Sequence, residues 1–273
     1  MTQQELLAEQ LRAQNEHKNY ATVTIISAEG STPRSSGKML VFEDGTSLGT
    51  IGGGRVERLA AQDAAECIAK GTNACKNYEL TADGIGMACG GDVGVFIEVY
   101  LSKPRLIQIG AGHVGGALIK LAKFCGFDVT LLDTRPLEYI QDKIDLADRF
   151  VHADDFYKGV AELEAAPGAC YVIATFGHAG DREALEAALK KKASYIGMVG
   201  SQKKVGELFS YLREKGFTQE ELDAVYTPIG LDIGSETPEE IALSIMAEIM
   251  LVKNGGSSKH LRECPVKTHQ KVK

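Results

Sequence analysis

The sequence lacks the features that mark several large classes of protein. Its 6 cysteines include no Cys-x-x-Cys pair and lie at irregular distances, which argues against a zinc knuckle or a disulfide framework. The longest stretch without Asp, Glu, Lys or Arg, 165–180, is interrupted by a proline, glycines and polar residues, so it is too short and too broken to cross a bilayer. Positive charge does not predominate either, because 30 Lys and Arg against 37 Asp and Glu give a net charge of −7. We therefore expect no membrane span and no nucleic-acid partner.

The N-terminal segment does not resemble an export signal, because no basic start is followed by an apolar block. It predicts an amphipathic helix with Leu6, Leu7 and Leu11 on one side. A cytoplasmic protein with reduced thiols is therefore expected. Three of the cysteines have apolar neighbours and are expected to act as small core residues. They are Cys67, Cys125 and Cys170.

Two parts of the chain differ in their pattern of secondary structure. A length of 273 residues, 44% of them hydrophobic, is typical of two globular domains. Residues 1–102 combine alternating apolar strands with one internal helix, which predicts a small α+β domain. The expected strands are 20–28, 39–42, 47–51, 75–80 and 93–101, and the internal helix is 55–69.

From residue 104 onward strands and helices alternate, as in a doubly wound parallel sheet. We place this α/β domain at 104–252 and a mobile basic tail at 253–273. The expected strands are 105–109, 128–132, 149–151, 171–175, 195–199 and 225–226. The expected helices are 114–125, 155–165, 182–191, 203–215 and 238–252.

A glycine-rich turn joins the first strand and the first helix of this second domain. It contains Gly110, Gly112 and Gly115, and Asp133 ends the next strand. The first glycine permits a tight turn, the second lets a pyrophosphate approach the backbone, and the third lets the helix lie on the strand. The acid accepts a hydrogen bond from a ribose hydroxyl, and its charge disfavours a 2′-phosphate. The arrangement predicts a Rossmann-like domain and, as one possibility, a site for NAD(P) with an unphosphorylated ribose.

Two histidines lie near the same edge of the predicted sheet. His113 follows the second glycine and faces either the phosphate side or only solvent. His178 lies just beyond the carboxyl end of a strand, where ligands of doubly wound sheets bind. With Asp181 it is a candidate catalytic residue, although Asp181 is expected to be a helix N-cap first and a partner for His178 second.

Three glycine-rich loops of the first domain are candidates for a single anion site. Glycine-rich turns expose backbone N–H groups, and a helix that begins at residue 54 or 55 adds positive potential. Cys89 either supplies a thiolate, the soft ligand of a thiophilic metal, or merely fits a tight turn. The candidate cofactor-binding residues in these loops are Arg34, Lys38, Gly52, Gly53, Gly54, Arg55, Glu57, Cys89, Gly90 and Gly91.

Many of these residues stand in the order of one known family. The motifs are Gly30-Ser31-Thr32-Pro33-Arg34, Gly37-Lys38-Met39, Ile51-Gly52-Gly53-Gly54 with Glu57, Cys89-Gly90-Gly91, Gly110-Ala111-Gly112-His113-Val114, Asp133-x-Arg135-Pro136, Thr175-x-x-His178-x-x-Asp181 and Pro228-Ile229-Gly230-Leu231-Asp232. They cover nearly the whole chain, which resembles the XdhC/CoxI family. The resemblance implies an XdhC/CoxI domain followed by a Rossmann domain, and a role in the maturation of molybdenum hydroxylases such as xanthine dehydrogenase.

The resemblance also implies ligands and partners. Members of the family are understood to bind the molybdenum cofactor (molybdopterin), to protect it during sulfuration by a cysteine desulfurase, and to transfer it to the apo molybdenum hydroxylase. Cys89 matches the Cys-Gly-Gly loop as a possible molybdenum ligand, and Arg34 matches the Thr-Pro-Arg turn. Arg55 stands where many members carry another cysteine, and its guanidinium could bind the pterin phosphate.

Three functions are compatible with the sequence. The first is a cofactor-binding chaperone without turnover, expected to be a homodimer. The alternative is an NAD(P)-linked oxidoreductase of an unknown small substrate, with His178 as the proton donor. A structural scaffold is the least favoured, because the loops carry many functional groups.

Overall fold

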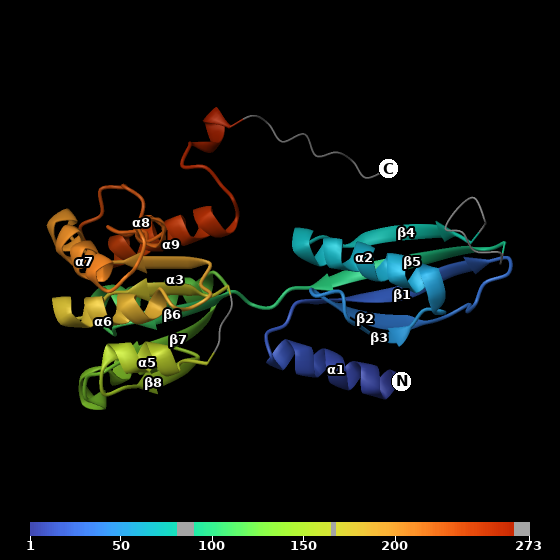
Figure 1. Cartoon of the computed structure of the whole chain (residues 1–273), viewed down its shortest axis with the longest axis horizontal. Helices are drawn as coiled ribbons and strands as arrows, with labels where there is room; N and C mark the ends of the chain where they lie inside the picture. The colour runs from blue at the N-terminus through green and yellow to red at the C-terminus, as the bar shows by residue number, and fades with distance from the viewer. Residues whose placement is uncertain (81–89, 165–167, 265–273) are drawn as a thin grey trace. The chain divides into compact units, whose positions relative to one another are not determined.

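A computed structural model describes residues 1–80, 90–164 and 168–264. The chain divides into two compact units, Met1–Lys103 and Pro104–Lys273 (Figure 1). The first unit contains an antiparallel sheet with helices, and the second contains a parallel sheet with helices on both faces. The predicted fold class, a small α+β domain followed by a Rossmann-like doubly wound sheet, is therefore confirmed.

The first unit is built on a five-stranded sheet in the order β3-β2-β1-β5-β4. Its strands are β1 (Tyr20–Glu29), β2 (Lys38–Phe42), β3 (Ser47–Thr50), β4 (Ala74–Glu79) and β5 (Asp92–Tyr100), and its helices are α1 (Gln3–Asn15) and α2 (Gly54–Lys70). Because side chains of a strand alternate between faces, β1 directs Val23 into the core under α2. Tyr20 points to the opposite face, where Leu6 of α1 packs.

The first helix buries a narrower stripe than the sequence predicts. Leu6 is buried, but Leu7 and Leu11 are 58% and 60% exposed. The row of α1 that meets the sheet runs from Leu6 to Ala13, two turns apart on one face of the helix. The expectation that the three leucines share the buried side is therefore wrong.

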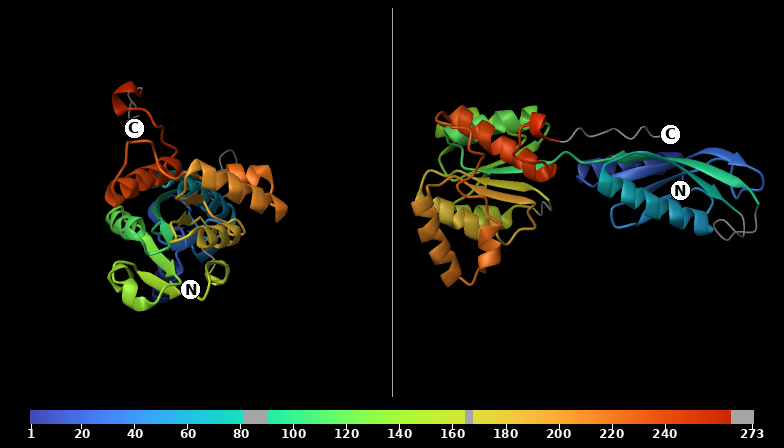
Figure 2. Two further views of the ribbon diagram at one scale, coloured as in Figure 1. Left: turned by 90° about the vertical axis from the view of Figure 1, so that its left-hand side faces the viewer. Right: turned by 90° about the horizontal axis from the view of Figure 1, so that it is seen from above.

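The second unit contains a parallel sheet in the order β10-β9-β6-β7-β8. Its strands are β6 (Arg105–Ile109), β7 (Asp128–Asp133), β8 (Arg149–His152), β9 (Cys170–Ile173) and β10 (Tyr195–Met198). Its helices are α3 (His113–Phe124), α4 (Gln141–Ile144), α5 (Phe156–Glu162), α6 (His178–Ala188), α7 (Gln202–Glu214), α8 (Gln219–Asp223) and α9 (Pro238–Lys253), with 3-10 turns at Leu137–Tyr139 and Leu261–Glu263. Helices α3 and α9 cover one face of the sheet, and α5 and α6 cover the other (Figure 2). Because β6 pairs in parallel with both β7 and β9, the carboxyl ends of these three strands lie side by side at one edge of the sheet.

The structure corrects several local predictions. The strand expected at 225–226 is only an isolated bridge between Gly197 and Tyr226, and α8 was not predicted. Cys125 is exposed, because it is the C-cap of α3 and follows the last helical turn. The last residue of the helix expected at 155–165, and residues 265–273 of the expected tail, lie outside the described residues. Within the described ranges, no helix has the length and hydrophobicity that crossing a membrane requires.

Candidate functional site

Loops of the first unit meet at one end of its sheet. A Cβ atom on Gly91 would lie 2.7 Å from the Ser31 carbonyl oxygen, so only a glycine lets the segment before β5 approach the loop after β1. A Cβ on Gly52 would lie 3.0 Å from Cβ of Pro33. The turn before α2 and the Gly90-Gly91 segment thus contact the same loop, 30–34. Cys89 itself lies outside the described residues.

Two backbone hydrogen bonds hold Gly90 and Gly91 beside the end of β4. The Leu80 N–H donates to the Gly91 carbonyl at 2.7 Å, and the Gly90 N–H donates to the Leu80 carbonyl at 2.9 Å. These bonds continue the pairing of β4 with β5, whose last partners are Glu79 and Asp92. Gly90 therefore has a fixed place beside the loop after β1.

A half-buried carboxylate shapes the triple-glycine turn. Gly52, Gly53 and Gly54 all have positive φ angles of 130°, 78° and 71°, a conformation that other residues rarely adopt. One carboxylate oxygen of Glu57, Oε2, accepts hydrogen bonds from the Thr50 hydroxyl at 2.6 Å and from the backbone N–H groups of residues 51 and 53 at 3.1 and 3.0 Å. Burial alone would raise the pKa of Glu57, but these bonds outweigh it and hold the pKa below its ordinary value. Glu57, predicted as a cofactor ligand, uses this oxygen to hold the turn.

The start of α2 has no side-chain cap at its N-cap residue, and Glu57 lies in its first turn. The N-cap of α2 is Gly53, which offers no side-chain cap, and a Cβ on Gly53 would meet no atom within 4 Å. The first N–H groups of a helix without such a cap carry positive potential. Arg34, Lys38 and Arg55 are exposed, and Arg34 is close enough to help lower the pKa of Glu57. The arrangement can bind a phosphate or another anion.

The glycine turn of the second unit has the geometry that the sequence predicts. Gly110 has a φ of 99°, and a Cβ there would lie 2.2 Å from the Ala174 carbonyl oxygen. A Cβ on Gly115 would lie 2.3 Å from the Gly110 carbonyl oxygen, whereas one on Gly112 would meet nothing within 4 Å. Gly112 is the N-cap of α3, without a side-chain cap, and His113 is the exposed first residue of that helix. The backbone is thus open where a pyrophosphate would approach.

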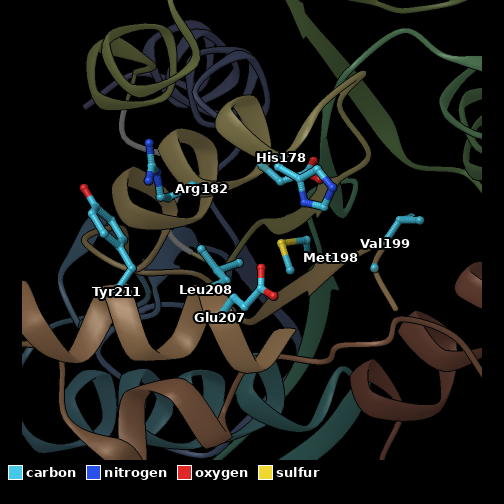
Figure 3. Close-up of a pocket in the computed structure, with 9 residues that line it drawn as sticks. His178, Arg182, Met198, Val199, Glu207, Leu208 and Tyr211 are labelled. Carbon is cyan, nitrogen blue, oxygen red and sulfur yellow. The ribbon is translucent and has the colours of Figure 1, made fainter. Parts of the chain in front are cut away.

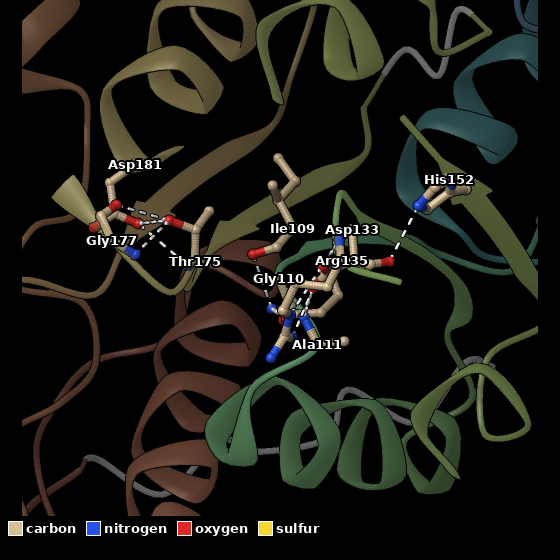
Figure 4. A network of polar contacts seen from close by, with 10 residues as sticks. Ile109, Gly110, Ala111, Asp133, Arg135, His152, Thr175, Gly177 and Asp181 are labelled. Carbon is tan, nitrogen blue, oxygen red and sulfur yellow. Dashed lines mark hydrogen bonds and ion pairs between the residues drawn. The ribbon is translucent and has the colours of Figure 1, made fainter. Parts of the chain in front are cut away.

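Asp133 does not present its carboxylate to solvent. Its side chain is 0% exposed and forms a salt bridge with Arg135. Oδ2 accepts from the Ala111 N–H at 2.6 Å and from Nη2 of Arg135 at 2.8 Å, while Oδ1 accepts from the backbone N–H and Nε of Arg135 at 2.9 and 3.0 Å (Figure 4). Burial would raise the pKa of Asp133, but these bonds hold it below the ordinary value. The predicted ribose contact requires that Arg135 be displaced.

Arg135 extends across the edge of the sheet. Its guanidinium carbon lies 5.5 Å from the centre of the Phe176 ring, and Phe176 follows β9. Because β6 lies between β9 and β7, the side chain spans the carboxyl end of β6, where Gly110 begins its turn. Neither Arg135 nor Phe176 was predicted as a site residue. Two sequence features could have identified them: Arg135 lies two positions after Asp133, and Phe176 is an aromatic residue shortly after the neighbouring strand.

His178 and Asp181 lie at the start of α6. The N-cap of α6 is Gly177, so Asp181 is inside the first turn and is not the predicted N-cap. Its Oδ1 accepts from the backbone N–H and the hydroxyl of Thr175 at 3.1 and 2.7 Å, and it thereby ties α6 to the end of β9 (Figure 4). His178 is exposed at the same edge of the sheet.

Both residues border a cavity of about 140 Å³. It lies between α6, the end of β10 and α7, and Arg182, Glu207 and Tyr211 line it as well (Figure 3). The Arg182 guanidinium stacks on the Tyr211 ring at 4.5 Å, and the Tyr211 hydroxyl donates to Glu186 at 3.2 Å. The sequence did not indicate Arg182, Glu207 or Tyr211, because α7 contributes to the cavity only through its tertiary packing.

No preformed metal centre is found within the residues that the structure describes, since no group of three or more His, Cys, Asp or Glu side chains there could hold an ion. The predicted molybdenum ligand, Cys89, is outside those residues.

Together these features define a two-unit protein that combines an antiparallel α+β unit with a Rossmann-type domain. The model of the XdhC Rossmann domain matches residues 106–249, and the model of the XdhC and CoxI family matches residues 13–79. The chain belongs to the XdhC/CoxI family, as the sequence motifs predicted.

Curated relatives extend the comparison. The chain is 35% identical over 252 residues to the uncharacterized protein YqeB of Escherichia coli K12, covering 91% of this chain and 46% of YqeB. It is 33% identical over 156 residues to a probable xanthine dehydrogenase subunit from Bacillus subtilis 168, covering 57% of this chain and 45% of that protein. The chain thus spans about half the length of these two relatives. It is also 24% identical over 268 residues to the molybdenum cofactor insertion chaperone PaoD of E. coli K12, covering 86% of this chain and 84% of PaoD.

A solved structure shares the fold. It is described as a xanthine dehydrogenase (BH1974) from Bacillus halodurans, with a TM-score of 0.50 and 22% sequence identity over 95% of this chain and 97% of that one. At this level of identity the similarity supports the architecture alone.

Proposed function

We propose that this protein is a maturation factor for a molybdenum hydroxylase of the xanthine dehydrogenase type, which binds the molybdenum cofactor and transfers it to the apo-enzyme. The observation that carries the proposal is the meeting of the 30–34 loop, the triple-glycine turn and the Gly90-Gly91 segment at one end of the first sheet. The likeness to PaoD, a molybdenum cofactor insertion chaperone that matches this chain along most of both lengths, supports it.

Different residues would hold different parts of the cofactor. The pterin phosphate is an anion, and it fits the open start of α2, with Arg55 and Arg34 as further donors. Cys89, which directly precedes Gly90, would bind the molybdenum through a thiolate, a ligand type that suits soft metal centres. When bound, the cofactor supplies the metal chemistry for its later host, and this chain contributes binding and shielding.

The proposal includes the cellular setting. A carrier of this kind would act in the cytoplasm as a homodimer, accept the cofactor while a cysteine desulfurase sulfurates it, and then dock on the apo molybdenum hydroxylase. Transfer requires reversible binding, so the protein would act without catalytic turnover.

Cofactor retention tests the proposal. The purified chain is incubated with molybdenum cofactor under anaerobic conditions and passed over a gel-filtration column, and the molybdenum that elutes with protein is counted. We expect stoichiometric retention by the wild type and a large loss in Cys89→Ser. Cys75→Ser, which changes an exposed cysteine of β4, is the matched control. Equal retention by the two variants would exclude Cys89 as the anchor, and no retention by the wild type would exclude the function.

We further propose that the second unit binds a dinucleotide. The supporting observation is the open backbone at Gly112 beside the uncapped start of α3. Beneath this turn, Nε2 of the fully buried Gln108 donates to the Gly110 carbonyl at 2.9 Å, while its Oε1 has no hydrogen-bond partner.

In the alternative function, an NAD(P)-linked oxidoreductase, His178 would donate the proton. Titration of nicotinamide fluorescence with protein tests for binding, and the absence of saturation would remove this second function.

A further inference from the structure

The carboxylate of Asp133, which was expected to accept a hydrogen bond from a ribose hydroxyl, already has its full number of hydrogen-bond donors. An ionised carboxylate offers about four lone-pair sites for hydrogen bonds. Asp133 uses four: one for the Ala111 N–H and three for Arg135. Because the side chain is also 0% exposed, a ribose hydroxyl finds neither a vacant lone pair nor access.

Arg135 is the member of the pair that a ligand can reach. Its side chain is 27% exposed. A guanidinium carries five N–H groups, and Asp133 engages Nε and Nη2, so three N–H groups remain for an incoming acceptor. The contacts with Asp133 on one side and the Phe176 ring on the other fix the plane of the guanidinium. A planar, preoriented donor of this kind matches the oxygens of a phosphate.

We propose that the crevice of the second unit takes a nucleotide with a phosphate on its ribose, such as NADPH, in preference to NADH, and that Arg135 determines this preference. The proposal rests on the proposed dinucleotide binding and adds the class of nucleotide to it. It reverses the preference for an unphosphorylated ribose that the position of Asp133 suggested. The reversal follows from the pairing, because the negative charge that would repel a 2′-phosphate is neutralised and covered by the guanidinium.

Parallel titrations with NADPH and NADH test the proposal on the full chain. We expect NADPH to bind at least about tenfold more tightly, as a charge-assisted contact implies. Arg135→Gln should bring the ratio of the NADH dissociation constant to the NADPH dissociation constant to about one or below, since it removes the cation and uncovers Asp133. Arg135→Lys should keep part of the preference. Arg213→Gln, which alters an exposed arginine on α7 that bonds to Gln219, should leave the ratio unchanged.

The outcomes separate the preference from the binding itself. If the wild type binds NADH as tightly as NADPH, the assignment of Arg135 is wrong while dinucleotide binding stands. If neither nucleotide binds, both are wrong. Circular dichroism shows whether each variant is folded. Should Arg135→Gln unfold because it leaves the buried Asp133 unpaired, Asp133→Asn provides a second test: it removes the buried charge and keeps Arg135, so NADPH should remain preferred.

Discussion

Replacement of Glu57 by glutamine should destabilise the first unit and loosen the triple-glycine turn. The carboxylate oxygen Oε2 holds three donors, the Thr50 hydroxyl and the N–H groups of Ile51 and Gly53. Glutamine keeps the length of the side chain and one acceptor oxygen, but it loses the negative charge. The change therefore isolates the charge-assisted part of these contacts.

The size of the effect follows from the hydrogen bonds. A bond to a charged group contributes more than one between neutral partners, and some of the three bonds can survive on the amide oxygen, so we expect a loss of about 2 kcal/mol. For a unit of this size each kcal/mol lowers the midpoint of thermal unfolding by roughly 4–8 °C. The shift is thus large enough to measure.

Thermal unfolding followed by circular dichroism, together with hydrogen exchange of residues 48–58, measures the change. Glu66→Gln is the matched control: it is the same substitution on the same helix, but Glu66 pairs on the surface with Lys70, and such pairs contribute less than about 1 kcal/mol. Equal midpoints for the two variants, with unchanged exchange at Ile51 and Gly53, would refute the role assigned to Glu57.

The pH dependence supplies an independent check. The pKa of Glu57 is lowered in the folded protein, so its contribution to stability is complete above the ordinary value of 4.5 and is lost as the pH falls through the folded value. The difference between wild type and Glu57→Gln should be full near neutral pH and shrink below about pH 4.5. A difference that stays constant down to pH 3 would contradict this reasoning.

Three other outcomes are expected. Gly115→Ala should lower the unfolding midpoint of the second unit markedly, because the new Cβ would clash with the Gly110 carbonyl oxygen. The matched change Gly112→Ala should keep the midpoint within about 2 °C, because its Cβ meets no atom, and should weaken dinucleotide binding in a titration. Tyr195→Phe should cost about 1–3 kcal/mol in urea unfolding, since the buried Glu248 loses the hydroxyl donor; an unchanged midpoint would contradict this. In alkaline titration followed by absorbance, Tyr195 should ionise only with unfolding, because burial, together with its hydrogen bond to Glu248, raises its pKa far above the ordinary value.

Much of the second unit could be predicted from sequence because its central strands β6, β7 and β9 are buried on both faces and are largely apolar. The glycine turn could be predicted for a related reason, since Gly110 and Gly115 are each required by a backbone contact at fixed spacing. The start of α6 could not. Gly177 caps the helix without a side chain, and Asp181, the most cap-like residue nearby, bonds instead to Thr175.

The chemistry of the sites was less predictable than the fold. Spacing identified Asp133 but not its partner, because whether a carboxylate meets a ligand or its own chain depends on the rotamer of Arg135, which tertiary packing decides. Glu57 shows the same limit: it stands beside the predicted anion loop and binds that loop's own backbone. At both positions the carboxylate bonds to the backbone of the neighbouring glycine turn and stabilises it.

The two hydrogen bonds that join Leu80 to Gly90 and Gly91 have a consequence for variation within the family. They extend the pairing of β4 with β5 beyond Glu79 and Asp92, so an insertion or deletion between Leu80 and Gly90 need not disturb the register of the two strands.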